Sequence, residues 1–251
     1  MPFQDDFLGR VEWARVGIYV FLATVVLGTC ATWLRDRFHW EDGYSRKLNH
    51  VGVMLLSAPI LAFLPKERLY PSVVFAALGV TLVYAIAALS TRPWLHNIVA
   101  GSLRKRDAPN SRFFFFFPLI TYDIALVVAG LLLPVEMVRT AFFTVALADG
   151  FAEPVGLYLG RNNQFHVPDF IWGGRNRKSI AGCSAVLFVA MLVAQYALSQ
   201  HYPLVIGLFA VSLGYAVVIT AIEAFAPRGF DNMLLVLSGS AVLPTLTRLF
   251  L

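Results

Sequence analysis

The sequence predicts an all-α, polytopic membrane protein in which residues 1–251 form a single domain. Hydrophobic residues make up 58% of the chain and charged residues only 14%, and the mean hydropathy is +0.69. Such a composition is typical of integral membrane proteins and not of a soluble domain. Several of the apolar runs approach the twenty residues that cross about 30 Å of hydrocarbon. We expect about eight transmembrane helices, at 16–34, 50–64, 71–90, 113–133, 135–158, 179–199, 203–225 and 231–250.

The first apolar run is expected to be a retained helix. The segment before it contains Asp5 and Asp6 and lacks a small-residue cleavage site, which is unlike a secretory signal peptide. Both cysteines, Cys30 and Cys183, lie within apolar runs. We therefore expect neither a disulfide nor a thiolate metal site.

The basic residues are distributed unevenly over the predicted loops. Fourteen of the 20 Lys and Arg residues follow the first, third, fifth and seventh runs. By the positive-inside rule these loops are cytoplasmic, and both termini lie on the opposite side. Topology and anionic lipid headgroups then account for the net charge of +5. Nucleic acid is not expected as a partner.

A cationic cluster precedes the second run. A helix that begins near Ser45 would place Arg46 and His50 on one face, with Lys47 beside them. This arrangement suits a polyphosphate, because Arg binds phosphate bidentately and a helix N-terminus adds its dipole. The alternative is that these side chains are interfacial cations that extend to the headgroups, with a neutral histidine.

The third run shows no residues with evident chemistry. The loop after it combines Trp94 and an apolar face with a basic segment, which predicts an amphipathic stretch on the inner leaflet. The fourth run contains a carboxylate, Asp123, beside Tyr122. A structural hydrogen bond between these two residues and a role in a site are both open for Asp123.

The most informative stretch begins in the fifth run. If it is helical, Asp149, Glu153, Gly156 and Gly160 lie at i, i+4, i+7 and i+11 and share one face. A carboxylate in the membrane costs about 2.5 to 3.5 kcal/mol, so this pair requires a cation or a polar cavity. We expect the glycine part of this face to be open. By itself the pair of glycines four residues apart would indicate only helix packing.

The loop after this run is basic and contains Arg161, Arg175, Arg177 and Lys178. Two adjacent glycines, Gly173 and Gly174, would allow backbone amides to surround an anion, and Ser179 is placed to cap the next helix. No GxxxxGK[ST] pattern occurs in the chain, which excludes a P-loop.

Further acidic residues lie at the junction of the seventh and eighth runs. Glu223 is near the end of the seventh run, and Asp231 with Asn232 begins the eighth. Asp231 alone would be read as a helix N-cap. The predicted topology, however, places these residues on the same side as the other polar clusters, which favours one shared site.

These residues and their spacing resemble the CTP-dependent lipid alcohol kinases, which include dolichol kinase, phytol kinase and the yeast-type diacylglycerol kinase. The family's R-K-x-x-H, D-x-x-A-x-x-x-G-x-x-x-G, K-S-x-[EA]-G and E…DN motifs are matched between residues 46 and 232. The matching positions are Arg46, Lys47 and His50; Asp149, Ala152, Gly156 and Gly160; Lys178, Ser179, Ala181 and Gly182; and Glu223, Asp231 and Asn232. Ala181 is more similar to the phytol kinase branch.

The resemblance implies a kinase that transfers the γ-phosphate of a nucleoside triphosphate, CTP in this family, to the hydroxyl of a lipid alcohol. It also implies a fold related to the CDP-diacylglycerol synthases. The core motifs would lie in 140–232, with 46–50 contributing. Phytol, a polyprenol or dolichol, and diacylglycerol are all candidate substrates.

This resemblance, with the chemistry of phosphoryl transfer, assigns a role to each motif residue. Mg²⁺ would be held by Asp149, Glu223, Asp231 and Asn232. The nucleotide would be bound by Arg46, Lys47, Gly156, Gly160, Arg161, Arg175, Lys178 and Ser179. Asp149, Lys47, His50 and Glu153 would be catalytic, with His50 or Glu153 taking the hydroxyl proton.

Other functions use similar residues. A cytidylyltransferase that acts on a lipid phosphate would need the same metal and cations, and it would release pyrophosphate. A transporter would place its carboxylates at the membrane midplane, whereas here the polar clusters lie towards one side. A purely structural scaffold is the least favoured. The sequence leaves open the lipid, the choice among CTP, UTP and ATP, and whether the protein is a homodimer.

Overall fold

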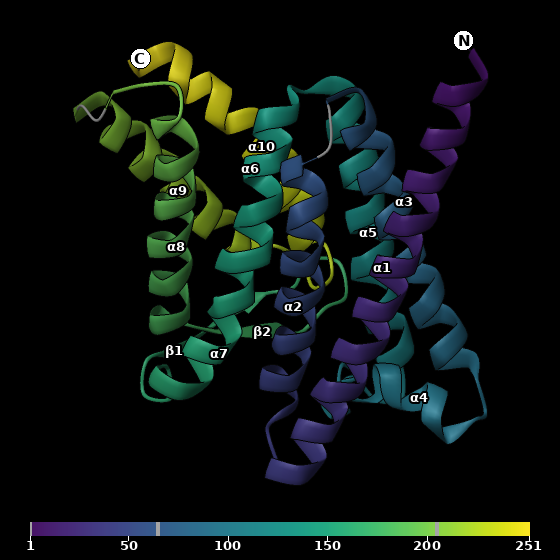
Figure 1. The fold of residues 1–251 in the computed structure, drawn as a ribbon. Coiled ribbons are helices and arrows are strands. Elements are labelled where there is room, and N and C mark those ends of the chain that lie inside the picture. Colours follow the sequence, from purple (N-terminus) through teal and green to yellow (C-terminus); the bar gives the residue numbers. More distant parts are fainter. Residues whose placement is uncertain (1, 64–65, 204–205) are drawn as a thin grey trace. The chain divides into compact units, whose positions relative to one another are not determined.

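The structure is a computed structural model that describes residues 2–63, 66–203 and 206–251 (Figure 1). Side chains are described outside 2–14, 57–71, 73, 106 and 204–205. The residues at 64 and 204–205, where two predicted runs end or begin, lie outside the described part. The chain divides into two compact units, Met1–Phe116 and Phe117–Leu251, and each is treated separately here. A single domain over the whole chain stays a prediction.

Within the part of the chain that the structure describes, each of the eight predicted apolar runs is largely helical. Their bounds are α1 Pro2–Phe38, α2 Asp42–Phe63, α3 Lys66–Leu89, α5 Ser111–Leu132, α6 Val135–Thr144 with α7 Gly150–Leu159, α8 Ile180–Ser199, α9 Ile206–Phe225 and α10 Asp231–Phe250. In the described residues, six helical segments are long and apolar enough to cross a membrane: Arg15–Phe38, Ser111–Leu132, Val135–Leu159, Ile180–Ser199, Ile206–Phe225 and Asp231–Phe250. The prediction of an all-α polytopic membrane protein is confirmed at this level.

The first unit is organised around the close approach of α1 to α4 (Pro93–Ala100). The Thr32 hydroxyl donates to the carbonyl of Asn97 at 2.6 Å and accepts from the Gly101 amide at 2.7 Å. Gly28 lies so close to the Ile98 carbonyl that a β-carbon would collide with it. Because the backbones of α1 and α4 approach so closely at Gly28, α4 packs directly against the C-terminal half of α1.

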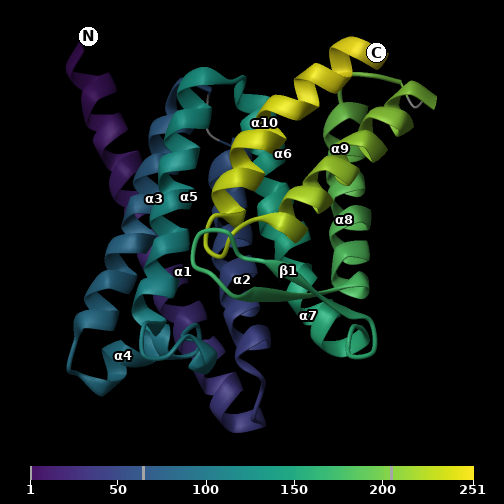
Figure 2. The same cartoon turned by 180° about the vertical axis from the view of Figure 1, so that it is seen from behind.

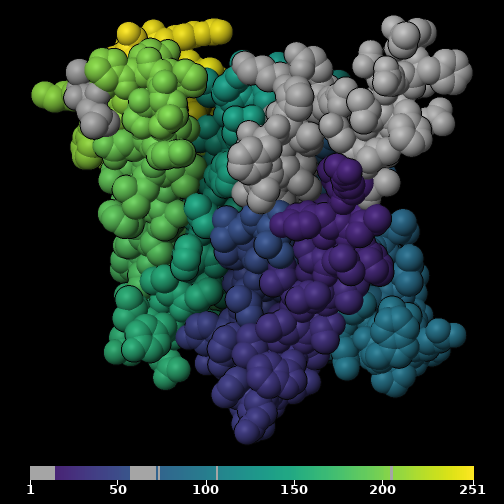
Figure 3. Space-filling model, in the orientation of Figure 1, coloured from purple at the N-terminus to yellow at the C-terminus, as the bar shows by residue number. Residues whose placement is uncertain are grey.

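In the second unit, α8 and α9 lie side by side, as both Figure 1 and Figure 2 show. The buried face of α8 repeats every four residues: Val186, Ala190, Ala194 and Leu198. Its outward face, part of the green surface in Figure 3, carries exposed Phe188, Leu192 and Tyr196. Small residues inside and large apolar residues outside are the pattern of a lipid-facing membrane helix.

The core of this unit is fixed by Tyr215 on α9, which is fully buried. Its hydroxyl hydrogen-bonds the Thr144 hydroxyl on α6 at 2.9 Å. A β-carbon on Gly239 of α10 would approach the same hydroxyl to 2.9 Å. One buried tyrosine therefore ties three membrane helices together.

The helix from α6 to α7 contains one turn of π-helix, η2, at Val145–Asp149. Single π turns inside α-helices are frequent at functional sites. The predicted helical geometry after Asp149 is confirmed, since α7 follows at once and ends beside Gly160. The π turn places Asp149 at its own C-terminal end, where it is buried.

Two short strands depart from the helical pattern. The strands β1 (Gln164–Pro168) and β2 (Arg175–Ser179) pair antiparallel, with Gln164 opposite Ser179 and Pro168 opposite Arg175. The chain reverses at Gly173 and Gly174, whose φ angles of 74° and 82° favour glycine. The predicted basic loop is therefore a β-hairpin that runs across the ends of α7 and α8 (Figure 1).

Candidate functional site

A buried ion pair of the second unit lies at the end of the helices next to the hairpin, and two further carboxylates act on it electrostatically. Lys178 Nζ, on β2, donates to Glu223 Oε1 on α9 at 2.6 Å and to the Glu223 carbonyl at 2.7 Å. Asp149 of η2 and Asp231 of α10 lie within electrostatic range of both residues. We call Asp149, Lys178, Glu223 and Asp231 the Lys178 cluster.

The cluster holds Lys178 in its charged form. Burial lowers the pKa of the Lys178 ammonium, but Glu223 and then Asp231 and Asp149 outweigh it, so the pKa is raised above the ordinary value. Three acidic side chains therefore act on one ammonium, and two of them, Asp149 and Glu223, are buried. Buried carboxylates are stabilised in proteins by cations.

The start of α10 carries two neighbouring side-chain oxygen groups of the kind that bind cations. The helix begins at Asp231, and its N-cap is Phe230, which makes no side-chain cap hydrogen bond. The reading of Asp231 as an N-cap is therefore wrong; its Oδ1 instead accepts the Asn232 amide at 3.0 Å. The buried Oδ1 of Asn232 has no hydrogen-bond partner among the described residues.

Within that same part of the chain, no three His, Cys, Asp or Glu side chains are grouped closely enough to hold a metal ion.

The glycine face of α7 is filled by the start of α8. A β-carbon at Gly156 would lie 2.8 Å from Ser179 Oγ, and one at Gly160 would lie 2.5 Å from it. The expectation of an open face here is wrong, because Ser179 occupies it. Contact of Gly156 and Gly160 with a nucleotide stays a prediction.

The predicted capping role of Ser179 is confirmed. Its hydroxyl accepts the Gly182 amide at 3.0 Å, and its side chain is buried between α7 and α8. Since β2 leads directly into this cap, the position of Ser179 also fixes that of Lys178 one residue earlier. A role of Ser179 in nucleotide binding stays a prediction.

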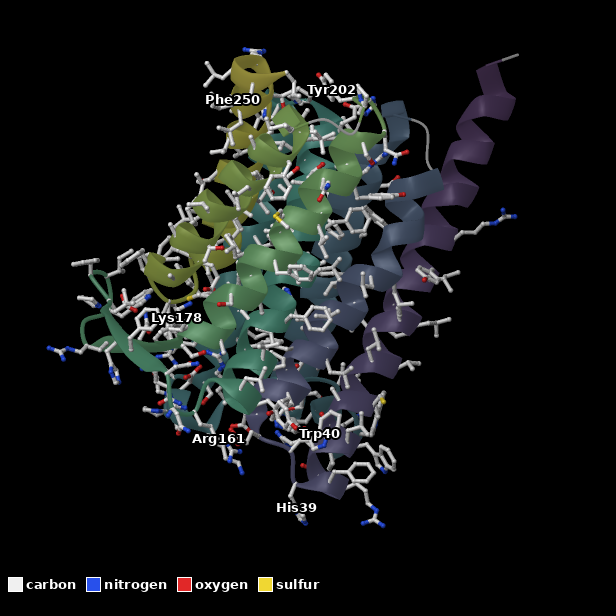
Figure 4. The ribbon with its side chains drawn as sticks, turned by 90° about the vertical axis from the view of Figure 1, so that its left-hand side faces the viewer. His39, Trp40, Arg161, Lys178, Tyr202 and Phe250 are labelled. Atoms are coloured by element: carbon white, nitrogen blue, oxygen red, sulfur yellow. The ribbon has the colours of Figure 1, made fainter. Side chains whose placement is uncertain are left out.

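The basic residues of the hairpin do not point the same way. Successive side chains of a strand alternate between its two faces. Arg175 and Arg177 are exposed on β2, whereas Lys178 is partly buried against Glu223. Arg161 is exposed at the end of α7, where its Nε donates to the Leu157 carbonyl at 3.3 Å (Figure 4). Only Lys178 of this set belongs to the cluster, and nucleotide binding by Arg161 and Arg175 stays a prediction.

The tip of the hairpin is organised by Asp169, a residue to which the sequence assigned no role. Its carboxylate accepts the amides of Ile171 and Trp172 and the side-chain amide of Asn176, at 3.1 to 3.2 Å. The amides that surround this carboxylate are not those of the predicted glycine pair: the Gly173 amide donates to the backbone carbonyl of Asp169. Binding of an external anion at Gly173 and Gly174 stays a prediction. A signal for the role of Asp169 was present, since Asp before a glycine turn commonly bonds amides two residues on.

Asp169 also connects the hairpin to the loop between α9 and α10. The same carboxylate accepts the Arg228 amide at 3.2 Å, and the Trp172 indole donates to the Arg228 carbonyl at 2.9 Å. Burial raises the pKa of Asp169, but these hydrogen bonds outweigh it and hold the pKa below the ordinary value. The hairpin and the loop before Asp231 are thus fixed to each other.

The predicted cationic cluster of the first unit lies on the first turns of α2. This helix starts at Asp42 and not near Ser45. Lys47 is 4% exposed, and Arg46 and His50 are half-buried. Asn49 donates to the Tyr84 hydroxyl and to Ser102 Oγ, both at 2.8 Å, and so fixes this turn. The phosphate-binding and catalytic roles of Arg46, Lys47 and His50 stay predictions.

Two remaining carboxylates lie in the second unit. Glu153 is half-buried on α7, one turn after Asp149, and its catalytic role stays a prediction. Asp123 is buried on α5. The Tyr122 hydroxyl has no hydrogen-bond partner in the described residues, so of the two alternatives left open for Asp123 the hydrogen bond to Tyr122 is not formed there.

Comparison with known proteins adds no relative. The chain matches no protein family model, no curated protein and no solved structure.

Proposed function

We propose that the protein is a membrane-embedded kinase that transfers the γ-phosphate of a nucleoside triphosphate, CTP by preference, to the hydroxyl of a lipid alcohol. The observation that carries this proposal is the Lys178 cluster. Phosphoryl transfer needs neutralised charge and correct positioning more than covalent catalysis. Carboxylates for a metal ion and a fixed lysine for phosphate are the groups that this chemistry requires.

Mg²⁺ is the metal that suits this donor set. Mg²⁺ is commonly bound by one or two carboxylates together with substrate phosphates and water, without a complete protein cage. Asp149 and Asp231 are two carboxylates of the cluster that act electrostatically on Lys178, and Asn232 Oδ1 adds an acceptor that lacks a partner in the described residues. Glu223 completes the proposed set. The bound ion would neutralise charge on the transferred phosphate.

The proposed reaction makes one bond and breaks one. The lipid hydroxyl oxygen bonds to the γ-phosphorus, the bond from this phosphorus to the bridging oxygen breaks, and the nucleoside diphosphate leaves. The hydroxyl proton passes to Glu153 or His50, the two bases that the sequence predicts. Lys178, kept protonated by its neighbours, donates to a phosphate oxygen as the negative charge moves.

The remaining assignments belong to the same proposal. Arg46 and Lys47 would add positive charge to the triphosphate, and the site would face the cytoplasm with both termini opposite. The fold would comprise about eight membrane spans and be related to the CDP-diacylglycerol synthases. The membrane itself would deliver the lipid alcohol laterally.

The test is a transfer assay on the purified full chain. Protein with Mg²⁺ and γ-labelled CTP or ATP is given phytol, farnesol, a polyprenol or diacylglycerol, and label in the organic phase is measured. Labelled lipid, lost on removal of Mg²⁺ by a chelator, is the expected result. CDP-lipid and pyrophosphate formed from a lipid phosphate would instead establish the cytidylyltransferase. Absence of both products would refute the proposal and favour a transporter.

A further inference from the structure

The hairpin tip exposes three consecutive large apolar side chains. Phe170 is 80% exposed, Ile171 52% and Trp172 41%. Burying one such side chain is worth about 1.5 to 3 kcal/mol, so their exposure to water would be unfavourable. A contiguous apolar patch with a polar rim marks a surface that meets a membrane or a partner.

The tip is held in this shape and is not a loose loop. The carboxylate of Asp169 accepts hydrogen bonds from the backbone amides of Ile171 and Trp172 and so fixes the backbone of the tip. The Trp172 ring packs edge-on against Phe117, with centroids 5.5 Å apart, while its indole is bonded to the loop of Arg228. Phe170 and Ile171 are therefore presented outwards by a fixed turn, which lowers the entropy lost when they bind.

The position of the hairpin indicates what covers these side chains. It begins five residues after the membrane helix that ends at Leu159 and joins directly to the one that starts at Ile180. The base of the hairpin is thus at the membrane surface. Five strand residues span about 17 Å, and the hairpin extends sideways from the helix ends near Lys178, as Figure 4 shows.

Charge complementarity identifies the kind of surface. Arg175 and Arg177 are exposed on β2 directly after the apolar tip. A basic residue near an anionic leaflet contributes about 1 kcal/mol, and aromatic residues concentrate at the interface between water and hydrocarbon. An apolar tip followed by two arginines matches acyl chains followed by anionic headgroups.

We propose that residues 170–172 insert into the interface of the protein's own membrane and that Arg175 and Arg177 bind its anionic headgroups. The hairpin is then a membrane anchor that sets the height of β2, and with it of Lys178, relative to the headgroups. This inference does not depend on the proposed kinase activity, and it gives Arg175 a lipid headgroup as its ligand in place of the nucleotide that the sequence predicts.

The test measures depth in the bilayer. A spin label is placed at Phe170→Cys in a chain whose native thiols are removed by Cys30→Ser and Cys183→Ser, reconstituted in nanodiscs of phosphatidylcholine with phosphatidylglycerol. Collision with oxygen, which concentrates in hydrocarbon, should exceed collision with a water-soluble nickel chelate. A label at Gln164→Cys, which is exposed at the other end of β1, should show the reverse. Equal nickel accessibility at both positions would overturn the proposal, as would shielding of position 170 from both reagents, which a protein partner would cause.

The headgroup part is tested in the same nanodiscs. Arg175→Gln with Arg177→Gln, or omission of phosphatidylglycerol, should move the label at position 170 measurably towards water. An unchanged depth in both cases would overturn the role of the arginines.

A second measurement needs no substitution and so does not depend on the variants folding. A lipid with a diazirine near the top of its acyl chain is photoactivated around the wild-type protein, and the tryptic peptide 162–175 is sequenced by mass spectrometry. Label at 170–172 and none at Gln164 is expected. Absence of label from the tip would contradict insertion.

Discussion

Lys178 Nζ lies 2.6 Å from Glu223 Oε1, and this ion pair joins β2 to the end of α9. The pair is mostly buried, with 20% of the Lys178 side chain and 7% of the Glu223 side chain exposed. Its partners come from positions 45 residues apart. The hairpin is therefore attached to α9 at its base by a charge pair, and Asp169 attaches its tip to the loop between α9 and α10.

Removing one member of this pair should destabilise the second unit. Lys178→Met leaves three carboxylates without their ammonium, and breaking a buried ion pair in this way costs about 3 to 5 kcal/mol. We expect a lower temperature of thermal unfolding in detergent for Lys178→Met. In the double variant with Glu223→Met, most of the loss should be recovered, and the coupling follows from a double-mutant cycle.

The matched control is the neighbouring basic residue. Arg177→Met removes the same charge from the exposed face of β2 and should change the unfolding temperature little. Equal losses for Lys178→Met and Arg177→Met would show that the pair does not stabilise the hairpin.

Asp169 should control the rigidity of the hairpin tip. In Asp169→Asn, the amide cannot accept from all four donors that the carboxylate binds, and an unsatisfied buried group costs about 1 to 3 kcal/mol. Hydrogen exchange at the amides of Trp172 and Arg228 should become faster by about ten-fold or more. Gln164→Ala, at an exposed position of β1, should leave both rates unchanged; faster exchange there as well would indicate a general loss of hairpin structure.

The same carboxylate predicts a pH dependence. Its pKa is lower in the folded protein than the ordinary value of about 3.9. The ionised carboxylate therefore contributes fully to the stability of the hairpin above that ordinary value. This stabilisation is lost as the pH falls through the lowered pKa. Hydrogen exchange measured from about pH 7 to about pH 2, corrected for the intrinsic rate, should show a constant difference between wild type and Asp169→Asn that shrinks only below about pH 4. A difference that shrinks near neutral pH would contradict this assignment.

The helices could be predicted from the sequence because hydrophobic runs of sufficient length leave few alternatives in a membrane. The hairpin could not, because the strand Arg175–Ser179 is polar and shows no apolar alternation. Its tip is fixed by a hydrogen bond that the Asp169 carboxylate accepts from the Arg228 amide, 59 residues further along the chain.

The residues of the candidate site could be predicted only in part, because their packing depends on contacts between distant segments. Periodicity showed that Asp149, Gly156 and Gly160 share a face, but it could not show that Ser179 packs on the glycine part of it. The approach of Asp149 and Asp231 to Lys178 depends on how α10 and the hairpin dock, which is a tertiary property. The motif resemblance selected these residues, and the structure supplied the ion pair between Lys178 and Glu223.

Gly160 should tolerate no side chain. A β-carbon there would lie 2.5 Å from Ser179 Oγ and 2.6 Å from its Cβ. Overpacking of this kind costs about 1 to 3 kcal/mol, so Gly160→Ala should lower the unfolding temperature in detergent. Gly79→Ala is the control, because its nearest neighbouring atom is 4.0 Å away and alanine favours the helix by about 1 kcal/mol. A neutral Gly160→Ala would mean that α7 and α8 can separate without loss.

Asp149 is the residue whose charge the proposed function needs most. Asp149→Asn keeps the size of the side chain but removes one carboxylate of the Lys178 cluster. We expect transfer of label from γ-labelled nucleotide to lipid to fall at least a hundred-fold, while the unfolding temperature in detergent stays near that of wild type. Asp123→Asn is the matched control, since Asp123 is also buried in the second unit and is not among the carboxylates that act on Lys178. Full activity in Asp149→Asn would remove this residue from the metal site, and equal losses in both variants would indicate a general effect of buried carboxylates on folding.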